Sequence, residues 1–358
     1  MGNPFTRFFD RIRGSGEAAI TLPPMDGALR PNNRIEEADV IFETSSPDNL
    51  VRSGSGISFS SGAVLMSLEK DGKTKALWNA SSHITCLAGH SSGTLAAGLE
   101  EGRIVIRGGP HDGLSLDRFE DTPVKAPSAA VFADEKTLYV CLASQDNPMS
   151  QWKRDLMSKG NSGSVWKVDL RTGKAVCLGR NLAFPYGIVL AENGDVIVSE
   201  SWRHQVIRIS EGGGIQTLLD ELPGYPSRLV RDANQDIWMC VFAPRTQLIE
   251  FVLSEKEYRT RMMETVDPEY WIAPSLHHPH SYLEPMQGGG LKQLGELKPW
   301  APTRSIGLVA RLDPQGHPIE SFHSRANGKR HGIASCLPSD DGLIMASIGG
   351  NVIVRAKN

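Results

Sequence analysis

Six polar residues stand directly before recurring apolar segments of the chain, and together they could perform acid–base chemistry. They are Asp48, His83, Ser128, Tyr186, Ser227 and His331, with Asn49 and Arg228 immediately beside two of them. Two histidines, a carboxylate and a phenol in one cavity can supply a general base and a general acid near neutral pH. We therefore predict that the catalytic residues are His331, His83, Asp48 and Tyr186.

The other polar residues of this set have the chemistry of substrate binding. Hydroxyl, amide and guanidinium groups can hold and polarise a substrate oxygen. The predicted substrate-binding residues are Ser128, Ser227, Arg228 and Asn49, joined by Glu200, which follows the second apolar run of its segment and could face the same pocket. An alternative stays open, because the two histidines and Asp48 could instead hold a divalent transition metal with open coordination positions.

The segments that these residues precede are copies of one unit. Each copy has an apolar run, a polar turn and a second apolar run, as in YGIVLAENGDVIVSE from 186 and SRLVRDANQDIWMCV from 227. Most copies begin about 40 residues apart, which is the usual length of a four-stranded propeller blade. The starts of six such blades surround one axis, so this repeat would bring the six polar residues together around a central pocket.

Short β-branched and aromatic runs separated by Gly, Asn and Asp turns predict an all-β fold. We expect a six-bladed β-propeller with four-stranded blades over residues 41–358, preceded by an N-terminal extension over residues 1–40. The last interval between copies is too long for one blade and carries an insertion at 254–304, rich in Pro, Gly, Met and aromatic residues. Long loops of this kind are typically lids or contact surfaces, so the insertion is predicted to be a lid or an oligomer contact.

The first fourteen residues, MGNPFTRFFDRIRG, predict a short amphipathic helix. Phe5, Phe8, Phe9 and Ile12 fall on one face at helical spacing. That face must cover something: the body of the protein, a second subunit of a homo-oligomer or, as the alternative, a membrane surface.

The composition limits the compartments and partners. The chain has 358 residues, of which 40% are hydrophobic and 22% charged, and its net charge is −3 with no Lys/Arg cluster, so no nucleic-acid partner is expected. No run approaches the roughly 18 apolar residues of a transmembrane segment, and no secretory signal is present, which predicts a cytoplasmic protein acting on a small molecule. The five cysteines are widely spaced in apolar runs, as expected of buried reduced thiols.

Four segments resemble a known family of propellers. They are NLAFPYGIVLAENGDVIVSESWRHQVIRI, ELPGYPSRLVRDANQDIWMC, IGLVARLDPQGHPIESFH and HGIASCLPSDDGLIMASIGGNVIVR. They resemble the strictosidine synthase-like branch of the SMP-30/gluconolactonase/LRE-like superfamily of six-bladed propellers, best over about 125–357. LPGYP and SESWRHQ are fairly specific to that branch.

The resemblance implies a site on the propeller axis, where the lactonase relatives hold a calcium ion that polarises the lactone carbonyl. The positions that match the calcium ligands are Asp48 or Asn49, Ser128, Tyr186 and Ser227. Only Asp48 and Asn49 remain as candidate metal ligands, so tight calcium binding is not expected, because calcium prefers six to eight oxygens with several carboxylates. The alkaloid-forming members use a glutamate shortly after the histidine that matches His331; here that position is Ile333, which argues against strictosidine synthase activity.

Two functions remain from different classes. The first is a hydrolase of a lactone or related cyclic ester, using the axial acid–base groups with Tyr186 and Arg228 as oxyanion donors, either without a metal or with an ion other than calcium. The second is a non-catalytic propeller that binds a small ligand or a protein partner under the inserted loop.

Overall fold

A computed structural model describes residues 22–69, 72–279, 284–285, 292–293, 296–297 and 303–357. The fold is a six-bladed β-propeller of four-stranded antiparallel blades, as the repeat predicted. The predicted amphipathic helix at the N-terminus lies outside the described residues.

The first three blades follow one another along the chain. Blade 1 is β2 (Pro47–Ser53), β3 (Gly56–Ser61), β4 (Val64–Leu68) and β5 (Thr74–Asn79). Blade 2 is β6 (Ile84–Gly89), β7 (Leu95–Leu99), β8 (Arg103–Arg107) and β9 (Ser115–Leu116). Blade 3 is β12 (Pro127–Asp134), β13 (Thr137–Leu142), β14 (Gly163–Asp169) and β15 (Ala175–Leu182).

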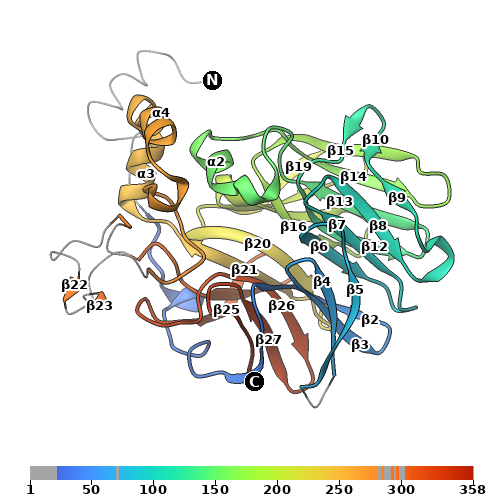
Figure 1. Cartoon of the computed structure of the whole chain (residues 1–358), viewed down its shortest axis with the longest axis horizontal. Helices are drawn as coiled ribbons and strands as arrows, with labels where there is room; N and C mark the ends of the chain where they lie inside the picture. The colour runs from blue at the N-terminus through green and yellow to red at the C-terminus, as the bar shows by residue number, and fades with distance from the viewer. Residues whose placement is uncertain are drawn as a thin grey trace.

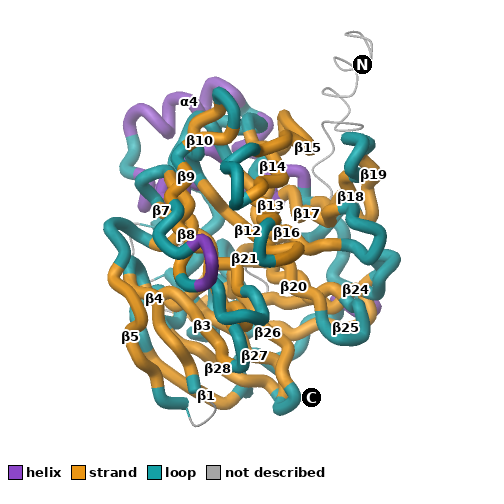
Figure 2. The backbone as a smooth tube through the Cα atoms, turned by 90° about the vertical axis from the view of Figure 1, so that its right-hand side faces the viewer, coloured by secondary structure: helices purple, strands orange, loops and turns teal. Residues whose placement is uncertain are grey.

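The last three blades complete the circle. Blade 4 is β16 (Pro185–Leu190), β17 (Val196–Glu200), β18 (Gln205–Ile209) and β19 (Ile215–Leu219). Blade 5 is β20 (Gly224–Arg231), β21 (Ile237–Pro244), β24 (Leu308–Leu312) and β25 (Pro318–His323). Blade 6 is β26 (Ile333–Ser339), β27 (Gly342–Ser347), β28 (Val352–Ala356) and, from the other end of the chain, β1 (Asp39–Glu43). Figure 2 shows the blades around a common centre.

The ring is closed by pairing between the two ends of the chain. β1 forms the outermost strand of blade 6 by pairing with β28, with Val40 opposite Val354 and Phe42 opposite Ile353. Residues far apart in the sequence thereby complete one sheet, which fixes the last blade against the first.

Helices and minor strands lie in the connections. The α-helices are α2 (Trp152–Met157), α3 (Gln247–Ser254) and α4 (Lys256–Thr265). The 3₁₀ helices are η2 (Gly27–Leu29), η3 (Gly109–His111), η4 (Met149–Gln151), η5 (Ser201–Arg203) and η6 (Pro268–Tyr270). Two short hairpins are β10 (Arg118–Phe119) with β11 (Thr122–Pro123), and β22 (Lys292–Gln293) with β23 (Glu296–Leu297).

The connection from β21 to β24 within blade 5 carries α3 and α4; it contains the predicted insertion at 254–304 and begins earlier, so that α3 begins before the predicted bounds. Thr246 begins α3 by accepting a hydrogen bond from the backbone N–H of Ile249, a normal N-cap. The buried face of α3 packs with Met262 of α4, with Trp271 and with α2 in one apolar cluster. Figure 1 shows α2, α3 and α4 at the same end of the propeller.

The first strand of every blade contacts the first strands of both neighbouring blades, so these six strands form a closed ring around the axis. Glycines allow the closest approaches. A Cβ atom on Gly187 of β16 would lie 2.3 Å from the backbone oxygen of Ser227 in β20. A Cβ atom on Gly89 of β6 would lie 1.9 Å from the backbone oxygen of Arg52 in β2. Only glycine fits where two backbones pass this closely.

Candidate functional site on the propeller axis

Arg228 of β20 reaches across the axis to several other blades. Its Nη1 donates to Oδ1 of Asp48 in blade 1 at 3.0 Å and to the backbone oxygen of Ala334 in blade 6 at 3.4 Å. Its Nη2 donates to the backbone oxygen of Thr85 in blade 2 at 2.6 Å. The guanidinium carbon also lies 5.0 Å from the ring centroid of Tyr186 in blade 4. One cation therefore joins five of the six blades.

Asp48 supplies the carboxylate of this group. Its Oδ1 accepts hydrogen bonds from Arg228 and from the backbone N–H of Asn49, at 3.0 and 2.7 Å. Within the described part of the chain, Oδ2 makes no hydrogen bond. The Asp48 side chain is 11% exposed, so one oxygen of a nearly buried carboxylate is left to act on a ligand.

Tyr186 supplies the phenol. Burial raises its pKa, and the positive charge of Arg228 opposes that rise without cancelling it. The hydroxyl therefore stays protonated and can donate a hydrogen bond. Its ring packs edge to face against Phe184 and Phe242, which fixes its direction. Asp48, Arg228 and Tyr186, which we call the axial cluster, are three predicted site residues that the fold brings together.

Asn49 and the two predicted serines hold the ring of strands together. Asn49, with a positive φ of 59°, donates from Nδ2 to the Ser60 hydroxyl and to the backbone oxygen of Ile84, and its Oδ1 is buried without a hydrogen-bond partner. The Ser128 hydroxyl lies 2.6 Å from the backbone oxygen of Pro185, and the Ser227 hydroxyl lies 3.3 Å from the backbone oxygen of Ala334. Each serine thus links its blade to the next.

Both carboxylate oxygens of Glu200 accept hydrogen bonds from nearby residues. It is buried, its Oε1 accepts from the backbone N–H of Ala183 at 2.6 Å and from Arg203, and its Oε2 accepts from Gln205 at 2.5 Å. With both oxygens engaged, this carboxylate anchors η5 to blade 4, so the geometry does not support its predicted contact with substrate.

The two histidines do not join the axial cluster. His331 is buried, its Nδ1 pairs with the Ser305 hydroxyl at 2.5 Å, and its Nε2 pairs with the backbone oxygen of Arg325 at 2.8 Å. Burial lowers its pKa to about 4. His83 is exposed and precedes β6. Both residues lie in the turns before their strands, so their side chains do not follow the strand direction that places Asp48 and Tyr186, and the geometry argues against either as the axial acid–base group.

The donor set does not fit a metal centre. Among the described residues, no group of three or more His, Cys, Asp or Glu side chains is placed to hold a metal ion. Calcium takes six to eight oxygens, whereas here the guanidinium of Arg228 already lies 3.0 Å from Asp48 Oδ1. A fixed positive charge at this position repels a divalent cation.

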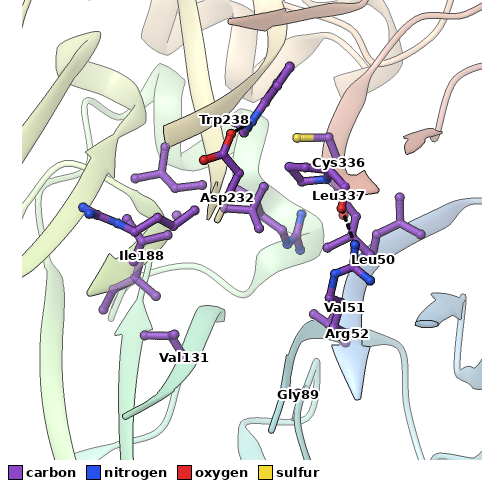
Figure 3. Close-up of a pocket in the computed structure, with 18 of the residues that line it drawn as sticks. Leu50, Val51, Arg52, Gly89, Val131, Ile188, Asp232, Trp238, Cys336 and Leu337 are labelled. Atoms are coloured by element: carbon purple, nitrogen blue, oxygen red, sulfur yellow. Dashed lines mark hydrogen bonds between the residues drawn. The ribbon is translucent and has the colours of Figure 1, made fainter. Parts of the chain in front are cut away.

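A cavity of about 1040 Å³ extends from Arg228 toward the ends of the six first strands. Figure 3 shows part of its lining, with Val131, Ile188 and Leu337 contributed by three different blades. Sequence reasoning placed the pocket at the strand starts instead. That end is filled by Trp152, Phe184 and other aromatic side chains, which pack around Trp202 and Phe242.

The lining residues of this cavity were missed from the sequence, although a signal for them exists. Most of them occupy the first apolar run of a copy, shortly after its polar position. Apolar runs of this kind generally pack between the sheets of a propeller. In a propeller they also border the channel, because the first strand of each sheet has no partner on its axial side.

The site belongs to a six-bladed propeller whose axis is crossed by an arginine. No family model matches the chain. It is 26% identical over 262 residues to the adipocyte plasma membrane-associated protein of Danio rerio, covering 63% of this chain and 61% of that protein. It is 24% identical over 129 residues to strictosidine synthase-like 10 of Arabidopsis thaliana, covering 35% and 34%. The chain thus spans about three fifths or less of the lengths of these relatives.

Solved structures show the same fold. A gluconolactonase from Xanthomonas campestris has a TM-score of 0.55 and 10% identity, covering 88% of this chain and 86% of that chain. Regucalcin, a calcium-binding protein from Agrobacterium tumefaciens, has a TM-score of 0.53 and 11% identity, covering 90% and 95%. The resemblance noted from the sequence is thereby confirmed: the structural neighbours are gluconolactonase and regucalcin propellers, and a strictosidine synthase-like protein is among the relatives.

Among the described residues, no helix is both long and apolar enough to cross a membrane.

Proposed function

We propose that the protein hydrolyses a lactone or a related cyclic ester at the axial cluster. The observation that carries this proposal is the convergence of a carboxylate and a protonated phenol from blades 1 and 4 on the guanidinium of Arg228 in blade 5, which lines the inner end of a large cavity. These groups are a base and two donors to a developing oxyanion, which is the minimum that ester hydrolysis needs. The fold likeness to a gluconolactonase is consistent with the proposal.

In the proposed reaction, the substrate carbonyl lies against Arg228 and Tyr186, and a water molecule lies against Asp48 Oδ2. The carboxylate takes one proton as the water oxygen bonds to the carbonyl carbon. The carbonyl oxygen becomes an oxyanion that accepts hydrogen bonds from the guanidinium and the phenol. When the ring C–O bond breaks, the proton on Asp48 passes to the leaving alkoxide, and the product is a hydroxy acid.

The roles can be separated with conservative variants. Asp48→Asn keeps the shape and removes the base, so turnover of lactones near neutral pH should fall by about 10²-fold or more. Tyr186→Phe removes one oxyanion donor and should lower kcat by a similar or smaller factor with little change in KM. Turnover is measured from the proton that the hydroxy-acid product releases after ring opening. Turnover by Asp48→Asn within threefold of wild type would refute the assignment of Asp48 as the base.

A second candidate is a non-catalytic propeller that binds a small ligand. The observation in its favour is that Asp48 is already paired with Arg228, so its main role could be to hold that arginine in place. The same variants decide between the two. A binding protein would show no lactone turnover above the uncatalysed rate in the wild type, and Asp48→Asn would change only ligand affinity, measured by calorimetry.

A further inference from the structure

The middle of the axial cavity is lined by aliphatic side chains. Every blade contributes to it through its first strand, and its volume of about 1040 Å³ lies just above the range for small-molecule sites, about 300–1,000 Å³. The aliphatic residues of the lining include Leu50, Leu87, Val131, Ile188, Val230 and Leu337. Ser335 also lies at this level, but its hydroxyl already accepts a hydrogen bond from the backbone N–H of Leu50 at 2.7 Å.

The inner end of the cavity offers an unused hydrogen-bond donor. The Nε–H of Arg228 is buried and has no acceptor, although Nη1 and Nη2 are both engaged. An unpaired buried N–H costs free energy that a ligand oxygen would recover. Arg228 is the axial-cluster residue that lines the cavity, so a carbonyl or carboxylate oxygen at the inner end lies next to this guanidinium.

Two further arginines stand nearer the mouth. Arg52, labelled in Figure 3, donates to the backbone oxygen of Pro338. The distance is 2.6 Å, and Arg231 donates to Gln235 at 2.9 Å. Within the described part of the chain neither forms an ion pair with a carboxylate. Of the three carboxylates in the lining, Asp232 is held by Trp238 and Arg311, Glu320 is paired with Arg34 and Arg311, and Asp340 is exposed. The mouth therefore favours anions.

We propose that the axial cavity takes compounds with an aliphatic chain, with the carbonyl or carboxylate end at Arg228 and the hydrocarbon along the aliphatic wall. This inference rests on the proposed function for the reacting group. It names alkyl-substituted lactones as the substrate class, with their hydroxy-carboxylate products, in preference to sugar lactones. Sugar hydroxyls would lose their hydrogen bonds to water against this wall and find no replacement among its aliphatic side chains.

The inference can be tested by binding alone. Butyrate, hexanoate, octanoate and decanoate are titrated into the full chain by calorimetry, with gluconate as the polar comparison. Each methylene buried against the wall should tighten binding about fourfold until the cavity is filled. Gluconate should bind at least tenfold more weakly than octanoate. Equal affinity along the alkanoate series, or gluconate binding as tightly as decanoate, would overturn the proposal.

A matched pair of variants locates the binding. Val131→Trp fills the cavity from the first strand of blade 3, whereas Val176→Trp places the same side chain on the outermost strand of that blade, where Val176 is 58% exposed. Decanoate binding should weaken at least tenfold in Val131→Trp and stay unchanged in Val176→Trp. If Val131→Trp unfolds, as circular dichroism would reveal, Leu337→Phe tests the opposite wall. Wild-type affinity in a folded wall variant would overturn the proposal.

The binding test and the turnover test can give independent results. Alkanoates cannot be hydrolysed, so their chain-length dependence reports only on the cavity. Chain-length-dependent binding without turnover of any lactone would remove the proposed hydrolase and keep the ligand class. Turnover of lactones with no dependence on chain length would keep the hydrolase and refute the aliphatic site.

Discussion

Replacing Arg228 by methionine tests whether this side chain braces the propeller from within. Methionine keeps most of the unbranched stem and removes the guanidinium. The variant loses hydrogen bonds to Asp48, to the Thr85 backbone and to the Ala334 backbone, which together connect blade 5 to blades 1, 2 and 6. It also leaves the carboxylate of Asp48 nearly buried without its counter-ion.

The expected cost follows from burial. Removing one partner of a buried ion pair costs about 3–5 kcal/mol, because the other charge stays uncompensated. The Arg228 and Asp48 side chains are 12% and 11% exposed, so some water reaches them and the lower value, about 3 kcal/mol, applies. With an unfolding entropy of about 2.1 cal/mol/K per residue over 358 residues, this lowers Tm by about 4 °C.

The assay is urea and thermal unfolding followed by circular dichroism, on Arg228→Met, Asp48→Asn and the double variant. The double variant should be less destabilised than the sum of the single ones by at least about 1 kcal/mol, because the two side chains interact directly. Arg103→Met is the matched control, since Arg103 pairs with Glu101 on the surface and should cost under about 1 kcal/mol. An Arg228→Met variant as stable as Arg103→Met, or strict additivity in the cycle, would refute the bracing role.

Four further predictions follow from the described contacts. The pKa of His331 is lowered by burial from 6.5 to about 4, so the unfolded chain binds a proton that the folded chain does not. Stability should therefore fall as pH drops from about 6.5 to 4, by up to about 3 kcal/mol from this residue, and His331→Gln should flatten part of that fall in urea titrations. His83→Ala should change neither turnover nor Tm measurably, because the side chain is exposed and outside the axial cluster; a 10²-fold loss of rate would restore the original assignment. Native protein should react with a thiol reagent at Cys177 at most, while unfolded protein reacts at all five cysteines, since the other four are buried and burial raises the pKa of Cys86 to about 11; rapid labelling of several thiols would contradict this packing. Dialysis against EDTA should leave Tm unchanged. If EDTA lowered Tm by several degrees and added calcium raised it again, the conclusion that these residues do not fit a metal centre would be wrong.

Much of the fold was predictable because the repeat is local. Each copy contains two strands and their turn, and the copies beginning at 48, 83, 128, 186, 227 and 331 correspond to the six blades. The closing strand β1 was not recognised as part of blade 6, because its partner β28 is at the other end of the chain and the repeat pattern does not extend to residues 39–43. The helices α3 and α4 were missed because the apolar face of QLIEFVLS is short and follows a strand directly.

The candidate site was predictable where a residue lies inside a first strand. Asp48 and Tyr186 are each the second residue of β2 and β16, so the repeat register fixed their position relative to the axis. His83 and His331 lie one and two residues before their strands, and there the backbone direction depends on the turn. The open end of the cavity could not be predicted, because it depends on Trp152 in the β13–β14 connection packing over the opposite end.

Arg228 makes contacts that a metal ion would make on the axis of a propeller. It binds one carboxylate and two backbone oxygens contributed by three other blades, as a cation with oxygen ligands does. The difference is that a guanidinium is tethered, planar and always charged. It cannot be lost to a chelator, and its remaining Nε–H has no acceptor among the described residues. Under the proposed function, the side chain that links the blades on the axis also polarises the substrate carbonyl, so a substitution at Arg228 should lower stability and turnover together.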